Sequence, residues 1–126
     1  MNYIEQALNT TNKDYESIKS RLQDDKIIKI LHGLMGMTTE TGEAMDALKK
    51  YLIYGKPLDM TNLEEETGDL FWYCAILADA CGFTFESSME KNIAKLRARY
   101  SNKFTEFDAM NRDLSRERAI LEGDMK

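Results

Sequence analysis

The absence of valine limits this chain more than any other feature of its sequence. Its 126 residues include no valine and one proline. Valine is among the strongest strand formers, and proline interrupts helix interiors. A β-sandwich or a parallel sheet built without valine would be unusual, so the composition predicts an all-α fold.

Charge and hydropathy exclude several broad classes of protein. Apolar residues make up 43% and charged residues 31% of the chain, as in a folded domain. The net charge of −5 argues against nucleic acid as a general partner. No apolar run approaches the ~20 residues that cross a bilayer, so we expect no membrane partner. The start, MNYIEQALNT, does not resemble a secretion signal.

The two cysteines also bear on location. If Cys74 and Cys81 share one helix, their separation along its axis is about 10.5 Å, which is too far for a disulfide. Reduced thiols without a secretion signal predict a cytoplasmic protein.

Apolar residues recur every three or four positions along most of the chain, which predicts a bundle of about five helices. The expected helices cover residues 2–23, 26–54, 61–81, 84–100 and 106–122. We expect one domain, 1–126, with its core at about 26–104. The charge-rich last helix would be a surface brace or part of a subunit interface.

Two pairs of acidic residues occupy unusual helical positions. Glu40 and Glu43 form one pair, Glu66 and Asp69 the other, and the i, i+3 spacing puts each pair on one helix face. Glu66 and Asp69 lie on the apolar stripe of their helix, where an uncompensated charge is costly. Alternatively, these acids only complement a helix N-terminus. Small residues surround Glu40, which indicates close approach of a ligand or simply of another helix.

A short loop joins the two helices that carry these pairs, so antiparallel packing would bring the four carboxylates level. Such carboxylates repel one another unless a cation is present. Oxygen ligands without His or Cys favour Mg²⁺, with Mn²⁺ as a possible substitute. The one histidine, His32, argues against a di-iron bundle, and we interpret it as a core or packing residue.

A basic face is expected on the fourth predicted helix. Asn92, Lys95 and Arg99 recur at helical spacing beside an apolar stripe, so their side chains could reach a bound phosphate. Alternatively, the two cations only complement the C-terminus of that helix.

These motifs resemble the MazG-like, all-α NTP pyrophosphohydrolases. The residues that carry the resemblance are ETGE at 40–43, ETGD at 66–69 and KLRARY at 95–100, and the similarity spans roughly residues 28 to 104. It implies that Glu40, Glu43, Glu66 and Asp69 bind Mg²⁺. It further implies that Lys95 and Arg99, and less directly Asn92, bind the substrate, and that the chain forms a homodimer or homotetramer.

The implied reaction is hydrolysis of a (d)NTP to the (d)NMP and pyrophosphate. A metal-activated water would attack the α-phosphorus, with Glu40 or Glu43 as the catalytic base. Trp72 or Tyr15 could stack on the base, although a core position is the simpler expectation for Trp72. Other possibilities are a dUTPase or dCTPase, a guanosine tetraphosphate hydrolase, or a non-catalytic metal-binding interaction protein.

Overall fold

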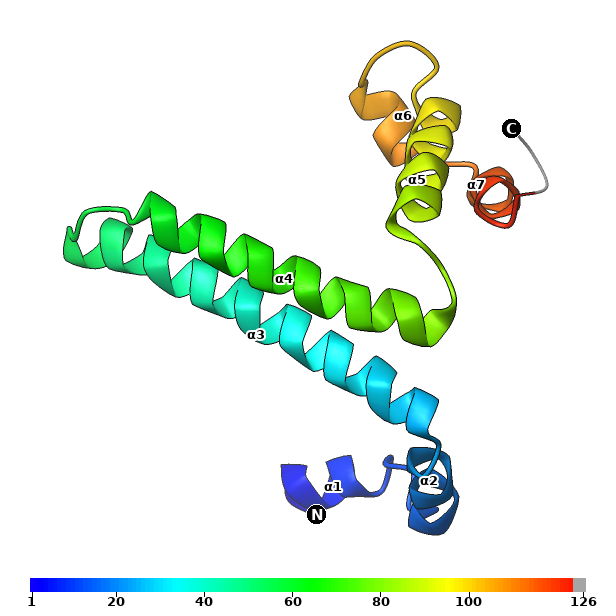
Figure 1. The fold of residues 1–126 in the computed structure, drawn as a ribbon. Coiled ribbons are helices and arrows are strands. Elements are labelled where there is room, and N and C mark those ends of the chain that lie inside the picture. Colours follow the sequence, from blue (N-terminus) through cyan, green and yellow to red (C-terminus); the bar gives the residue numbers. More distant parts are fainter. Residues whose placement is uncertain (124–126) are drawn as a thin grey trace. The chain divides into compact units, whose positions relative to one another are not determined.

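The computed structural model describes residues 1–123 and is all-α (Figure 1). Seven helices and no strands occur in this range, as the composition predicts. The chain divides into two compact units, which are described separately: unit 1 is Met1–Cys81, and unit 2 begins at Gly82. No helix within residues 1–123 is both long and apolar enough to span a bilayer.

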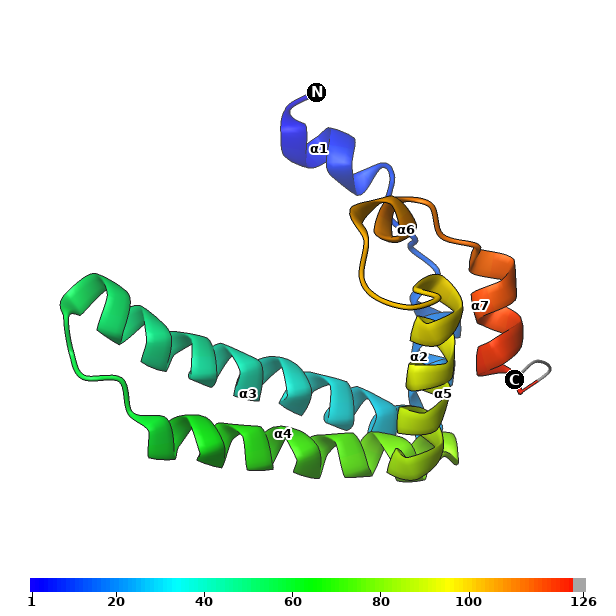
Figure 2. The same ribbon diagram turned by 90° about the horizontal axis from the view of Figure 1, so that it is seen from above.

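Unit 1 is dominated by a long helical hairpin. After the short helices α1 (Tyr3–Leu8) and α2 (Tyr15–Leu22), helix α3 (Asp25–Tyr54) runs antiparallel to α4 (Met60–Cys81). The two long helices lie side by side in both views (Figures 1 and 2). This arrangement confirms that the helices carrying the acidic pairs pack against each other.

Local chemistry sets the turn of the hairpin. Helix α3 ends at Gly55, whose φ of 68° is in the left-handed region that glycine adopts without steric cost. The start of α4 is stabilised by Asp59, whose Oδ1 accepts a hydrogen bond from the Asn62 backbone N–H at 3.0 Å. The short connection keeps α3 and α4 in register.

Helices α3 and α4 make a very close contact at two glycines. Gly33 and Gly36 are the residues of α3 in the buried class. The ring of Tyr73 lies directly over Gly36, where an added Cβ would be 2.0 Å from Tyr73 Cδ1. At Gly33, an added Cβ would be 3.2 Å from Leu77 Cβ. The small residues that precede Glu40 therefore serve a helix crossing, which was one of the two sequence-based interpretations.

Unit 2 contains α5 (Phe85–Arg99), α6 (Glu106–Met110) and α7 (Leu114–Leu121). Thr84 caps α5 by accepting a hydrogen bond from the Ser87 N–H. Helix α7 packs on α5 and buries Ile120 and Glu117. A carboxylate is therefore one of the most enclosed side chains of this unit.

Two predicted helices are each split in the structure. The helix expected over 2–23 is interrupted after α1, where the Thr10 and Thr11 hydroxyls donate to backbone carbonyls, and Asp14 starts α2 as a new N-cap. The helix expected over 106–122 is interrupted at Asn111, and Asp113 caps α7. In both places, side-chain hydrogen bonds to the backbone replace a continuous helix.

Candidate metal centre

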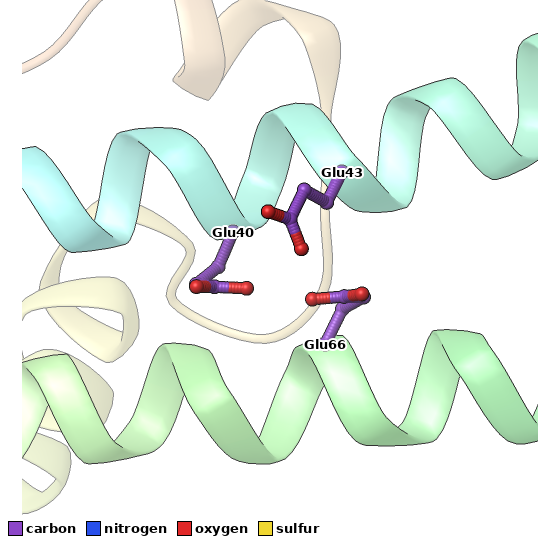
Figure 3. Close-up of side chains that lie close together, drawn as sticks. All are labelled: Glu40, Glu43 and Glu66. Atoms are coloured by element: carbon purple, nitrogen blue, oxygen red, sulfur yellow. The ribbon is translucent and has the colours of Figure 1, made fainter.

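Three carboxylates from the two long helices converge between them. Glu40 and Glu43 come from α3 and Glu66 comes from α4, and one oxygen of each lies within 4.8 Å of the others. Figure 3 shows the three side chains directed into the space between the helices. The i, i+3 spacing of Glu40 and Glu43 puts both on the face that packs against α4, and the antiparallel register brings Glu66 level with them.

The cluster contains oxygens that lack hydrogen-bond donors. Glu66 is 8% exposed, and its Oε1 accepts a hydrogen bond from Asn62 Nδ2 at 3.1 Å. Within residues 1–123, Glu66 Oε2 and Glu40 Oε2 are buried without any hydrogen-bond partner. Buried polar atoms are nearly always paired, so two unpartnered carboxylate oxygens in one cluster need an explanation.

The acids also disturb one another's ionisation. The pKa of Glu40 is raised to about 7, first because a protonated Glu40 could donate a hydrogen bond to the Glu66 carboxylate, and then by burial and the neighbouring negative charges. The pKa of Glu43 is raised for similar reasons, whereas that of Glu66 is lowered, chiefly because its carboxylate could accept a hydrogen bond from a protonated Glu40. Without a cation, the cluster therefore retains a proton near neutral pH.

A divalent cation fits this arrangement. It would supply the missing partner for Glu40 Oε2 and Glu66 Oε2 and would replace the shared proton. The ligand group of Glu40, Glu43 and Glu66 offers oxygen only, which suits Mg²⁺ or Mn²⁺.

Room for a ligand adjoins the carboxylates. A hollow of about 590 Å³ is lined by Glu43, Glu66 and Asn62 together with Thr39, Gly42, Asp46 and Lys50. Lys50 is paired with Asp46 at 2.9 Å on the same helix. Apart from Gly42, the lining residues all have polar or charged side chains, which suits a charged ligand.

The other predicted site residues lie outside the group of three carboxylates. Asp69 is exposed and lies outside the group of three carboxylates, although its charge contributes to the raised pKa of Glu40. Asn92, Lys95 and Arg99 belong to unit 2, on α5. Arg99 is bound to Glu117 by two hydrogen bonds. The metal role of Asp69 and the substrate roles of the three α5 residues remain predictions.

Two residues with clear roles were missed in the sequence. The side chain of Asn62 donates a hydrogen bond to Glu66, and their i, i+4 spacing was the available signal. Glu117 was passed over within a charge-dense segment, and nothing local distinguishes it from its neighbours.

An aromatic cluster lies on the same hairpin as the acids. The ring of His32 meets Tyr73 and Trp72 edge-on, at centroid distances of 5.7 and 6.5 Å. His32 is exposed, so it is a packing residue and not a core one. The core position expected for Trp72 is wrong, because this side chain is 59% exposed.

One comparison with known protein families bears on the fold and the acidic centre. Residues 31–104 match the family model of the MazG nucleotide pyrophosphohydrolase domain, which is more than half of the chain. The chain therefore belongs to the MazG nucleotide pyrophosphohydrolase domain family. No curated protein and no solved structure matches it at a significant level.

Proposed function

We propose that the protein is a Mg²⁺-dependent nucleotide pyrophosphohydrolase that cleaves a (d)NTP to the (d)NMP and pyrophosphate. The observation that carries this proposal is the convergence of Glu40, Glu43 and Glu66 between two helices, with two of their oxygens buried and unpartnered. Membership of the MazG family supports the reaction class.

In the proposed mechanism, Glu40, Glu43 and Glu66 would hold the metal, with Asp69 as the fourth ligand. Mg²⁺ bound there, or Mn²⁺ in its place, would neutralise negative charge on the triphosphate. Glu40 or Glu43 accepts a proton from the water that attacks the α-phosphorus, and pyrophosphate leaves.

The remaining binding roles are assigned to residues outside the carboxylate group. We propose that Asn92, Lys95 and Arg99 bind the phosphates, since guanidinium and ammonium groups suit phosphate oxygens. The exposed face of Trp72 makes it available to stack on a base.

A product assay tests the proposal directly. The protein is incubated with Mg²⁺ and each NTP, dNTP or dUTP, and the products are resolved by ion-exchange chromatography. Monophosphate and pyrophosphate should form with the wild type and be lost with Glu43→Gln, which preserves side-chain size. Glu64→Gln, an exposed position on α4, is the matched control and should remain active.

Other products would redirect the assignment. Diphosphate and phosphate would overturn attack at the α-phosphorus. Turnover of dUTP or dCTP alone, or of guanosine tetraphosphate, would identify a specialised hydrolase on the same centre. If Mg²⁺ raises the melting temperature but no nucleotide is hydrolysed, the protein is a metal-binding interaction protein.

We further propose that the protein is a homodimer or homotetramer. Large apolar side chains of the hairpin are highly exposed, including Leu52, Ile53 and Met45 on α3 and Phe71 on α4. Exposed apolar surface of this kind typically marks an interface. Sedimentation velocity should show a dimer or a tetramer, and a monomer at micromolar concentration would contradict the proposal.

We also propose a cytoplasmic location. Cys74 and Cys81 are both free thiols on α4, as their spacing predicts, and free thiols are typical of a reducing compartment. Cell fractionation tests this, and recovery from an oxidising compartment would refute it.

A further inference from the structure

Unit 2 contains a buried carboxylate that is shared by two arginines. Glu117 Oε1 accepts hydrogen bonds from Arg99 Nε at 3.1 Å and from Arg99 Nη2. Arg112 Nε donates to Glu117 Oε2 at 3.0 Å, and Arg112 Nη2 donates to Oε1 at 3.2 Å. The Glu117 side chain is 6% exposed, so this is an enclosed network that joins α5, α7 and the segment before α7.

The charges of this network do not balance. Hydrogen bonds from Arg112 and Arg99 lower the pKa of Glu117 to about 2, so its carboxylate is ionised at neutral pH. Two guanidiniums against one carboxylate leave one positive charge. Within residues 1–123, neither arginine has a second ion-pair partner, although the protein is acidic with a net charge of −5.

The two arginines differ in their access to solvent. The Arg99 side chain is 14% exposed, whereas that of Arg112 is 41% exposed. Arg112 contacts Glu117 through one edge of its guanidinium, Nε and Nη2. Among the described residues no acceptor is paired with its Nη1, which can therefore donate to a ligand from solvent.

We propose that Arg112, held by Glu117 beside Arg99, is a phosphate-binding residue, and that Glu117 is the positioning residue that makes the two guanidiniums one anion site. Planar guanidiniums match phosphate oxygens in geometry, and orienting them beforehand reduces the entropy lost on binding. The ligand class is a phosphate-bearing anion. This inference deepens the proposed function, because Arg99 is among the residues assigned to the substrate's phosphates.

Binding of pyrophosphate to the full chain, measured by calorimetry at low salt in EDTA, tests the site without metal or turnover. We expect wild type to bind and Arg112→Gln to lower the affinity about tenfold, the scale of one charge-assisted hydrogen-bonded contact. Arg118→Gln is the matched control, because Arg118 lies on α7, is 75% exposed and pairs with Glu122. It removes the same charge and should change the affinity by less than about twofold.

Glu117→Gln separates positioning from simple attraction. This change makes the site more positive, so attraction alone would strengthen binding, whereas loss of positioning should weaken it. If Glu117→Gln loses its helical circular dichroism, that variant is unfolded and cannot be interpreted. The comparison of Arg112→Gln with Arg118→Gln then tests the proposal, because both variants retain the Arg99–Glu117 pair. No binding by wild type, equal effects of the two arginine changes, or stronger binding by a folded Glu117→Gln would each overturn the proposal. None of these outcomes depends on hydrolysis, which the product assay tests separately.

Discussion

Replacing Gly36 with alanine should destabilise the hairpin, although alanine is normally the better helix former. An added Cβ would lie 2.0–2.2 Å from three carbons of the Tyr73 ring. Carbon atoms in contact are separated by about 3.5–4.0 Å, so the ring or the helices must move by roughly 1.5 Å. Overpacking typically costs about 1–3 kcal/mol, against a propensity gain of up to about 1 kcal/mol. We expect Gly36→Ala to lower the free energy of unfolding by about 1–2 kcal/mol.

The same helix provides the control. A Cβ added at Gly42 meets no atom within 4 Å, so Gly42→Ala gains helix propensity without a clash. It should raise the free energy of unfolding by about 0.5–1 kcal/mol. The two glycine variants should therefore differ by about 1.5–3 kcal/mol, with opposite signs relative to wild type.

The assay is urea unfolding followed by tryptophan fluorescence. Trp72 is the one tryptophan of the chain, and its ring centroid lies 5.0 Å from that of Tyr73, so its emission reports on this crossing. If Gly36→Ala is as stable as Gly42→Ala, then Tyr73 does not pack on the backbone of α3. The conclusion that α3 and α4 approach closely there and so align the acids would then be refuted.

Three further predictions concern charge. Because the pKa of Glu117 is about 2 in the folded protein and 4.5 ordinarily, its contribution to stability is complete above about pH 4.5 and is lost as the pH falls towards 2. In an acid titration followed by circular dichroism, this pH dependence of stability should be absent from Glu117→Gln. The raised pKa of Glu40 has the opposite effect on stability, so in EDTA the melting temperature should fall as the pH rises from 4.5 to about 7 and Glu40 loses its proton. Adding Mg²⁺ at pH 8 should restore the melting temperature, and no response to Mg²⁺ would contradict the metal centre. Lys29→Met removes an exposed ion pair to Asp79 and should cost at most about 1 kcal/mol in urea unfolding, so a larger loss would mean that the pair is enclosed.

Much of the acidic centre could be predicted from the sequence because its geometry is local. The spacing of Glu40 and Glu43 fixes them on one helix face, and a short loop with Gly55 fixes the register that brings Glu66 opposite. Asp69 has the same spacing from Glu66 that Glu43 has from Glu40, yet it is exposed and lies outside the group, so the spacing alone does not select the carboxylates that converge.

The helix break after α1, the exposure of Trp72 and the role of Glu117 depend on contacts that the apolar periodicity of the sequence does not predict. Thr11 and Tyr15 continue the apolar spacing across a break that threonine side-chain hydrogen bonds create. Trp72 is exposed because its neighbour Tyr73 takes the inward position over Gly36. The role of Glu117 requires the pairing of α5 with α7, which no local signal specifies.

The Arg99–Glu117 pair joins the segment that matches the family to the residues that follow it. Arg99 lies inside the segment that matches the family, and Glu117 lies beyond its end at residue 104. A chain shortened at that boundary would lose Glu117 and Arg112 together with α7, which packs on α5, and with them the paired guanidiniums of unit 2.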